Sequence, residues 1–197
     1  MQKFLEYMSE PQNIMWIIIV IILIISKFGI GLNYISVNEI VKNHLYCFRN
    51  KDGKLLIIPV INYICIPFLM GGATAVVKKI DSNTINVITI IISILTAMLF
   101  TMLTMVIDMK AKIKKDPEYF STEAQISKTA LLETYYTIMF EILISVILLI
   151  LCFFNCFTRA YGNVQSFLIY SLTYMLIINL LMVIKRIFRV IDTNMRK

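Results

Sequence analysis

The sequence predicts an all-α integral membrane protein with four to five transmembrane helices, a surface amphipathic helix and a cytoplasmic helical stalk. Of its 197 residues, 59% are hydrophobic and only 16% are charged, a balance outside the range of soluble globular domains. The hydrophobic residues gather in five runs separated by polar segments. A run of about 20 such residues can cross a bilayer as a helix. No repeat or linker divides the chain, so residues 1–197 are expected to form a single membrane domain.

The charged and sulfur-containing residues argue against several other classes of protein. A net charge of +7 would suggest nucleic-acid binding in a soluble protein. Here the Lys and Arg residues lie between the hydrophobic runs, where they anchor topology, so no direct nucleic-acid contact is expected. Four Cys without a CxxC pair and a single His indicate neither a zinc site nor a disulfide framework, so no metal or other cofactor is expected.

Catalytic motifs are also missing from the sequence. There is no HExxH, GxxxxGKS or GxSxG motif, and an enzyme would need a nucleophile with a base, a metal shell or a phosphate-binding loop. The chain is therefore not expected to be an enzyme. A lipid-modifying activity that uses an unfamiliar Asp–Arg pair is the alternative.

The first hydrophobic run, Ile14 to Leu32, can be interpreted in two ways. Its uninterrupted core, IMWIIIVIILII, has a dozen residues, and Lys27, Gly29 and Gly31 interrupt the remainder. The run either crosses the membrane, with Lys27 reaching the interface, or lies shallow. Spanning is the favoured interpretation. Two acidic residues precede the core and no small-residue cleavage site follows, so the run is expected to be a retained anchor.

An amphipathic helix is predicted between the first and second runs. The segment Ser36 to Glu39 is a capping box, and hydrophobic residues then recur at helical spacing. Such a helix is expected to lie on the inner membrane surface. For the single His on its apolar side, a packed or interfacial imidazole is the favoured interpretation and a pH switch is the alternative. The apolar face comprises Val37, Ile40, Val41, His44, Leu45 and Phe48.

The second run, Leu55 to Val77, contains residues that favour contact with a neighbouring helix. Pro59 and Pro67 predict a kink that frees backbone carbonyl groups. Gly71 and Gly72 permit the close approach of another backbone. These two glycines are therefore expected at a helix-packing or oligomer contact.

The third and fourth runs belong to a long helical hairpin, the centre of the predicted fold. Its first arm, Ile85 to Ile107, continues into DMKAKIKK without a helix breaker. Pro117 ends this helix, and a capping box at Thr122 to Gln125 starts a second arm that extends from Glu123 to Phe157. Roughly 35 helical residues measure about 52 Å, against about 30 Å of hydrocarbon. Residues 108–137 are therefore expected to project from the membrane as a cytoplasmic helical hairpin, the stalk.

Charged residues along the hairpin are candidates for helix pairing and partner binding. Glu133 and Glu141 lie two turns apart on nearly the same face and are expected to pair with the Lys-rich first arm, with ion conduction as the alternative. Asp108 is expected to pair with a Lys or Arg of another helix, with a gate as the alternative. The predicted docking residues for a soluble partner are Lys110, Lys112, Lys114, Lys115 and Lys128.

The last run, Val164 to Ile184, continues as KRIFRVIDTNMRK and is expected to pack beside the stalk as a third helix. In a five-span topology, 15 of the 19 Lys and Arg residues fall on one side of the membrane. This bias predicts a cytoplasmic stalk and C-terminus. The chain is too small to enclose a wide conduit alone, so oligomerisation is expected.

Three stretches together resemble a known family. They are the two spans that follow Leu55 with the short turn KKIDSN between them, the segment TEAQISKTALLETYYTIMFEILISVILLIL, and the terminal TYMLIINLLMVIKRIFRVI. In length, architecture and hydropathy they resemble the KwaA family, the membrane components of the Kiwa anti-phage defence system. The resemblance covers most of the chain after Leu55. The additional run Ile14 to Leu32 departs from that family's four-span pattern and leaves the number of spans open.

The resemblance implies a function for the chain. It implies a multi-pass protein of the bacterial inner membrane that forms a homo-oligomer, with a tetramer favoured, and that senses phage attachment or envelope disturbance. It also implies that the stalk docks a soluble cytoplasmic effector, a KwaB-like protein. The alternatives are a pore-forming abortive-infection effector that depolarises the membrane and a small channel or transporter.

Overall fold

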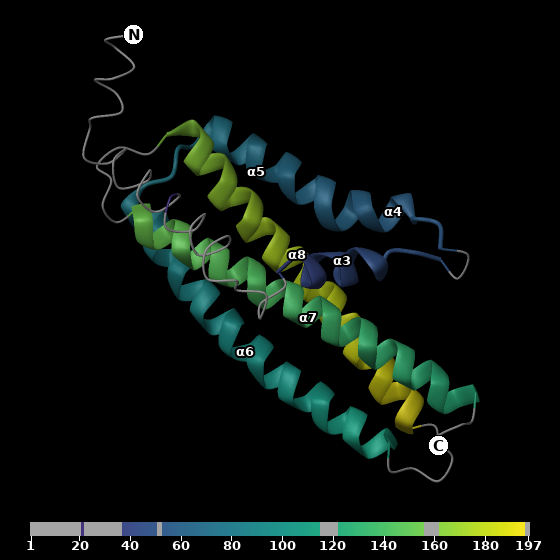
Figure 1. The fold of residues 1–197 in the computed structure, drawn as a ribbon. Coiled ribbons are helices and arrows are strands. Elements are labelled where there is room, and N and C mark those ends of the chain that lie inside the picture. Colours follow the sequence, from purple (N-terminus) through teal and green to yellow (C-terminus); the bar gives the residue numbers. More distant parts are fainter. Residues whose placement is uncertain (1–20, 22–36, 51–52, 115–121, 156–161, 196–197) are drawn as a thin grey trace.

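The structure, a computed structural model, describes residues 21, 37–50, 53–114, 122–155 and 162–195. These residues form helices and no β-strand, which confirms the all-α class. The elements in chain order are α3 (Val37–Tyr46), α4 (Ile57–Val60), the π-helix η1 (Ile61–Cys65), α5 (Ile66–Val77), α6 (Ser82–Lys114), α7 (Thr122–Asn155) and α8 (Asn163–Met195) (Figure 1).

Four helical segments among the described residues are long and apolar enough to cross a membrane. They are Ile57–Val77, which joins α4, η1 and α5, and the greater part of each of α6, α7 and α8. Four of the predicted runs are therefore confirmed as helices of sufficient length and apolar composition to span a membrane. The first hydrophobic run, Ile14 to Leu32, lies outside the described residues apart from Ile21, so a fifth span stays a prediction.

The segment Ile57–Val77 contains a wide helical turn at the place where its prolines predict a kink. Pro67 lies in the first turn of α5; its ring has no N–H to donate to the carbonyl of Tyr63, four residues earlier. The π-helix η1 directly precedes it, and a π-helical turn accommodates one more residue than an α-helical turn. Ile66 continues with helical dihedral angles of −60° and −47°, so the three elements form one span.

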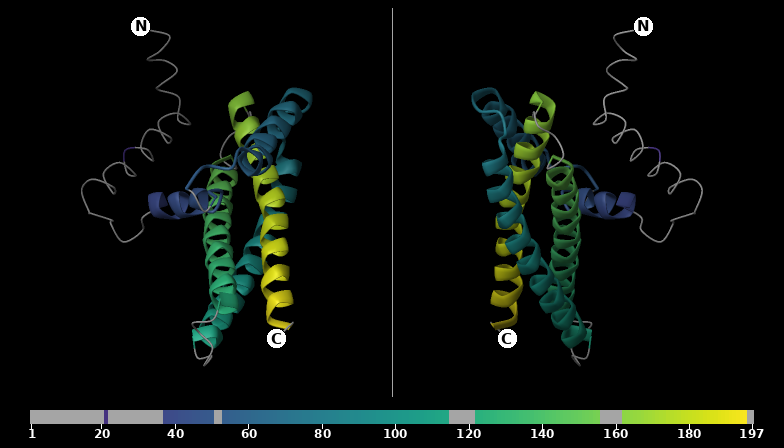
Figure 2. Two further views of the ribbon diagram at one scale, coloured as in Figure 1. Left: turned by 90° about the vertical axis from the view of Figure 1, so that its right-hand side faces the viewer. Right: turned by 90° about the vertical axis from the view of Figure 1, so that its left-hand side faces the viewer.

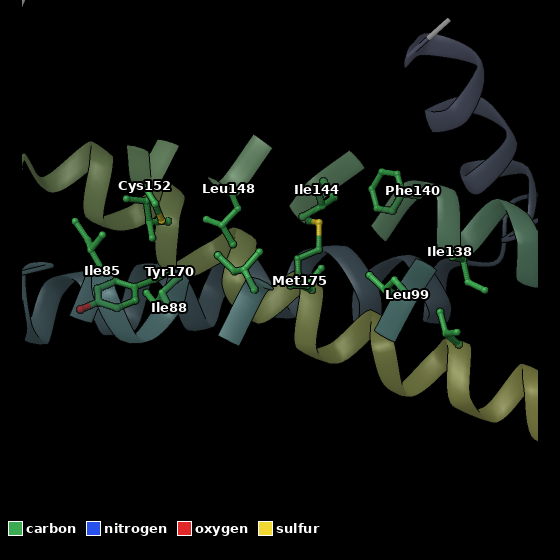
Figure 3. Packing of buried hydrophobic residues seen from close by; sticks show 14 of the residues in the cluster. Ile85, Ile88, Leu99, Ile138, Phe140, Ile144, Leu148, Cys152, Tyr170 and Met175 are labelled. Atoms are coloured by element: carbon green, nitrogen blue, oxygen red, sulfur yellow. The ribbon is translucent and has the colours of Figure 1, made fainter. Parts of the chain in front are cut away.

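Helices α7 and α8 form the centre of the bundle. Helix α8 packs against α5 and α7, α6 packs against another part of α7, and α3 contacts α7. Buried side chains from α6, α7 and α8, including Ile85, Leu148 and Met175, form the core (Figure 3). The end of α6, the start of α7 and the end of α8 lie at the same end of the molecule (Figures 1 and 2).

The turn between α5 and α6 is fixed by hydrogen bonds at the opposite end of the bundle. The Asp81 carboxylate accepts a hydrogen bond of 2.7 Å from the backbone N–H of Thr84, which caps the start of α6. The backbone N–H of Ile80 donates to the Ser166 hydroxyl of α8 at 3.1 Å. The short connection therefore brings α5 and α6 together beside the start of α8.

Gly71 lies at the closest approach of α5 and α8. A Cβ atom added at Gly71 would stand 2.6 Å from both the Cα and the backbone N of Ser171, whereas one added at Gly72 would meet only the Phe167 ring, at 3.6 Å. One turn along, the hydroxyl groups of Thr74 and Tyr174 are 3.1 Å apart. Gly71 is thus an intramolecular packing position, because no larger residue leaves room for the backbone of α8.

The outer faces of α5 and α6 expose large hydrophobic side chains. Leu69, Val76 and Val77 of α5 are among the most exposed, as are Ile90 and Ile94 of α6. Apolar surface of this extent is typical of a protein that contacts lipid.

Candidate functional site

A stack of aromatic rings holds α3 against α7. The His44 imidazole lies parallel to the Phe140 ring of α7, with 3.9 Å between centroids and 5° between planes. The Phe48 ring meets His44 edge-on at 5.0 Å and stacks on Tyr63 of η1 at 6.0 Å. His44 and Phe48 are both buried. The end of α3 and the residues directly after it are therefore anchored between two of the spans.

A helix, α3, is present in the segment where the amphipathic helix is predicted, and it lies crosswise to α7, partway along that helix (Figure 2). Its apolar face is divided between two environments. Ile40 and Val41 pack against the core, as His44 and Phe48 do. Val37 and Leu45 remain exposed. That these exposed side chains rest on a membrane surface stays a prediction.

Burial keeps the imidazole of His44 neutral near pH 7. Neither ring nitrogen has a hydrogen-bond partner among the described residues. Burial lowers the pKa of His44 from 6.5 to about 3, and the positive charge of Arg186 contributes to the shift. His44 therefore behaves as a packed aromatic ring in this arrangement, and protonating it would place an unpaired charge beside Phe140.

We expect acid to destabilise the folded protein through His44. Between pH 6.5 and about pH 3 the unfolded chain binds a proton at His44 that the folded chain does not bind, so stability rises with pH in this window and is lost as the pH falls. The free energy of unfolding should fall by about 1.4 kcal/mol per pH unit. His44→Phe should remove this contribution, and the melting-temperature difference between variant and wild type should widen from pH 7 to pH 5. Parallel curves for the two proteins would contradict the assignment.

Arg186 of α8 joins the residues that surround the end of α3. Its Nη1 donates hydrogen bonds to the backbone carbonyl of Glu133 at 2.9 Å and to the Thr137 hydroxyl at 2.8 Å. The same nitrogen lies 3.8 Å from the Glu133 carboxylate. Thr137 in turn donates to the Glu133 carbonyl at 2.8 Å. The guanidinium therefore links α8 to one full turn of α7.

Cys47 completes this junction from the side of α3. Its thiol donates to the carbonyl of Asn43 at 3.2 Å and lies 3.9 Å from the carbonyl oxygen of Glu133. Burial raises the pKa of the Cys47 thiol, although the charge of Arg186 opposes the change. A thiol with a raised pKa is a poor nucleophile, so Cys47 serves here as a packing residue.

The pairing predicted for the acidic residues differs from the observed one. Glu133 was expected to pair with the Lys-rich arm of α6, but it pairs with Arg186 of α8. Glu141 has no ion pair or hydrogen bond to any described residue. Asp108 is exposed on α6, with no ion pair in the described part of the chain. The reason is the rotation of α7, which directs Glu133 and Glu141 toward α8 while α6 packs elsewhere on its surface.

Glu141 and Asn179 form a buried polar pair inside the spans. Both are inaccessible to solvent, and the Asn179 side chain of α8 faces the Glu141 carboxyl. Neither the carboxyl oxygens nor the amide atoms reach a hydrogen bond with a described residue. Glu141 stands one turn beyond Thr137 on α7, so polar groups continue from the α3 junction into the apolar core. An ionisable residue at this depth is a candidate for function.

Two clefts flank the junction and share Cys47 and Glu133. The α3–α7 cleft, of about 570 Å³, lies between the end of α3 and the start of α7, and the α4–α8 cleft, of about 330 Å³, lies between α4 and the end of α8. The first is lined by Asn43, Tyr46, Arg49, Asn50, Gln125, Lys128, Thr129, Leu132 and Tyr136, and the second by Phe48, Leu56, Pro59, Tyr63, Ala130, Met182, Lys185, Arg186 and Arg189.

The predicted docking lysines are only partly brought together. Lys128 lines the α3–α7 cleft, whereas Lys110 and Lys112 are exposed near the end of α6. Lys114 is the last residue of α6, and Lys115 lies outside the described residues. In the described ranges no group of three or more His, Cys, Asp or Glu residues is arranged to hold a metal ion.

Arg186 is the site residue that sequence reasoning missed. It follows Asn179 by seven residues, a spacing that places both side chains on one face of a helix. That spacing was the available signal. It could not identify Glu133 and Thr137 as partners, because a residue pattern along one helix does not state which helix lies opposite.

The four apolar helices define the chain as a multi-pass helical membrane protein. Comparisons with protein-family models, with curated proteins and with solved structures found no match.

Proposed function

We propose that this protein is a membrane-anchored scaffold whose long helices extend beyond the bilayer and bind a soluble protein. The observation that carries the proposal is a difference in helix length. Helices α6, α7 and α8 have 33, 34 and 33 residues, about 50 Å each, whereas Ile57–Val77 has 21 residues, about 30 Å and close to the hydrocarbon thickness. The three long helices are therefore longer than the hydrocarbon layer of a bilayer requires.

The position of α4 supports an assignment of this extra length to one end of the bundle. Leu56 and Pro59, at the start of the shorter span, line one cleft with Ala130 of α7 and Arg189 of α8. The part of α7 before Ala130 and the part of α8 after Arg189 therefore extend past the shorter span. Cys47 and Phe48, directly after the crosswise helix α3, line the same cleft, which supports a position of α3 at the membrane interface.

The projecting end carries positive charge and a cleft beside it. Lys110, Lys112 and Lys128 lie on this part of α6 and α7, and the charge bias along the chain favours the cytoplasm as its location. The α3–α7 cleft combines Tyr46 and Tyr136 with cationic side chains. Aromatic and cationic groups in a half-enclosed cleft suit an acidic segment of a soluble protein.

The resemblance to the KwaA family supplies the biological setting of this proposal. In that setting the chain is an inner-membrane sensor and scaffold of an anti-phage defence system, assembled as a homo-oligomer, and the docked protein is a KwaB-like effector. The alternative, a channel or a pore-forming effector, is favoured by one observation, the buried Glu141–Asn179 pair.

Reversing the charges of the projecting end is expected to release the soluble partner. The variant Lys110→Glu, Lys112→Glu, Lys128→Glu should lose at least about tenfold in co-purification with the KwaB-like protein, because the introduced carboxylates repel an acidic surface. Membrane insertion, followed by fractionation, should be unchanged. The control is Lys79→Glu, an exposed position at the opposite end of the bundle.

Two results would contradict the scaffold proposal. One is equal co-purification of the triple variant and the Lys79→Glu control. The other is collapse of the membrane potential when the chain is expressed without the KwaB-like protein, since a scaffold alone should be harmless. The second result would favour the pore-forming effector.

A further inference from the structure

We propose that the α4–α8 cleft binds the phosphate headgroup of an anionic phospholipid. The cleft lies where three spans end. Leu56 and Pro59 adjoin the start of the span Ile57–Val77, Ala130 is close to the start of the α7 span at Lys128, and Arg189 is the last residue of the α8 span. Headgroups occupy this level of a bilayer on either side of the membrane, so the inference does not depend on the proposed orientation or function.

The charged lining of the cleft matches a phosphate. Among the described residues of the lining, Lys185, Arg186 and Arg189 contribute three cationic side chains and Glu133 contributes one carboxylate. Basic pockets between transmembrane helices at this depth bind anionic headgroups. Tyr63 also lines the cleft, and its hydroxyl is a further hydrogen-bond donor.

Arg186 is held in an orientation that suits an anion. Its Nη1 makes the hydrogen bonds to Glu133 and Thr137, and these two bonds use two of the five N–H donors of a guanidinium. The remaining donors belong to Nε and Nη2. A guanidinium that is fixed on one side loses little conformational entropy when it binds a phosphate on the other.

The surroundings of the cleft favour a lipid over a free anion. Leu56, Pro59 and Met182 line the cleft together with the cationic groups. On α8, Leu181 and Ile184 precede Lys185 and are exposed. Acyl chains can lie along this apolar surface while the headgroup enters the cleft, whereas inorganic phosphate would gain nothing from it.

Lipid binding by the full-length protein in a mild detergent tests the inference. The probes are dioctanoyl phosphatidylglycerol, dioctanoyl phosphatidylcholine and inorganic phosphate. We expect phosphatidylglycerol to bind at least about tenfold more tightly than phosphatidylcholine and than inorganic phosphate. The variant Lys185→Gln, Arg189→Gln should lose at least about tenfold in affinity for phosphatidylglycerol, and it leaves Arg186 and its contacts to α7 in place.

A matched variant distinguishes binding in the α4–α8 cleft from non-specific electrostatic attraction between the lipid and other cationic residues. Lys110→Gln, Lys112→Gln removes the same charge from α6 and should bind phosphatidylglycerol as the wild type does. Lys185→Arg keeps the charge and should also keep the affinity, while the melting temperature without lipid should be alike for all variants. Equal losses in the two double variants, or inorganic phosphate bound as tightly as phosphatidylglycerol, would overturn the inference.

Discussion

Gly71→Ala is expected to lower the free energy of unfolding by about 1–3 kcal/mol, the usual cost of overpacking a close contact. The added methyl group would stand 2.6 Å from the Cα and the backbone N of Ser171. Alanine gains roughly 1 kcal/mol over glycine within a helix, but this gain cannot offset a clash with backbone atoms. The whole of α8 would have to move away from α5, and the contact between Thr74 and Tyr174 would be lost with it.

The neighbouring glycine provides a control with the same chemical change. Gly72→Ala would bring its methyl group to an ordinary distance of 3.6 Å from the Phe167 ring, so only the helix-propensity gain should remain. Thermal unfolding in detergent should show a loss of several degrees for Gly71→Ala, at about 2–4 °C per kcal/mol, and no loss for Gly72→Ala. Equal melting temperatures for the two variants would contradict the close approach of α5 and α8.

Arg186→Met should destabilise the protein by about 3 kcal/mol. Methionine keeps an unbranched apolar stem but has no guanidinium group, so the hydrogen bonds to the Glu133 carbonyl and to Thr137 are lost. A hydrogen bond to a charged group contributes about 1.5–3 kcal/mol. The ion pair adds little to this sum, because the Glu133 side chain is 42% exposed and water screens its charge.

A second measurement identifies Arg186 as the source of the effect. Its charge helps to lower the pKa of His44, so that pKa should rise in Arg186→Met. The pH range over which His44 makes the free energy of unfolding depend on pH should then end at a higher pH than in the wild type. Lys185→Met, an exposed neighbour, should change stability by no more than about 0.5 kcal/mol and should leave that pH range unchanged. Similar losses in the two variants would show that the bonds of Arg186 do not link α7 to α8.

Hydropathy was sufficient to predict the all-α class and four helices long and apolar enough to span a membrane. A hydrophobic run as long as Ile85 to Ile107 is expected to be helical in a bilayer, because a helix pairs its own backbone N–H and C=O groups and unpaired groups are costly in lipid. Short sequence motifs also predicted the start of one helix and the inward side of another. The capping box at Thr122 starts α7 at that residue, and the spacing of Ile40, Val41 and His44 identified the side of α3 that packs inward.

The pairing of the charged residues could not be predicted in the same way. Helix α7 is apolar on most of its surface, so its sequence does not mark which face meets α8 and which meets α6. Glu133 was therefore assigned to the Lys-rich first arm of the hairpin, and not to Arg186, which lies 53 residues away. The depth at which Glu141 is buried follows from the same rotation, which arises only from the packed bundle.

The π-helical turn η1 has a consequence for which residue meets α8. Successive residues of an α-helix are offset by about 100° around its axis. A turn that holds one extra residue therefore shifts the sequence by one residue relative to every later place on the helix surface. If Ile61–Cys65 were regular, Met70 would occupy the azimuth of Gly71 against Ser171, where no side chain fits. The π-helical turn thus determines which residues of α5 face α8. A hydropathy profile reports only the hydrophobicity of each position and does not reveal this turn.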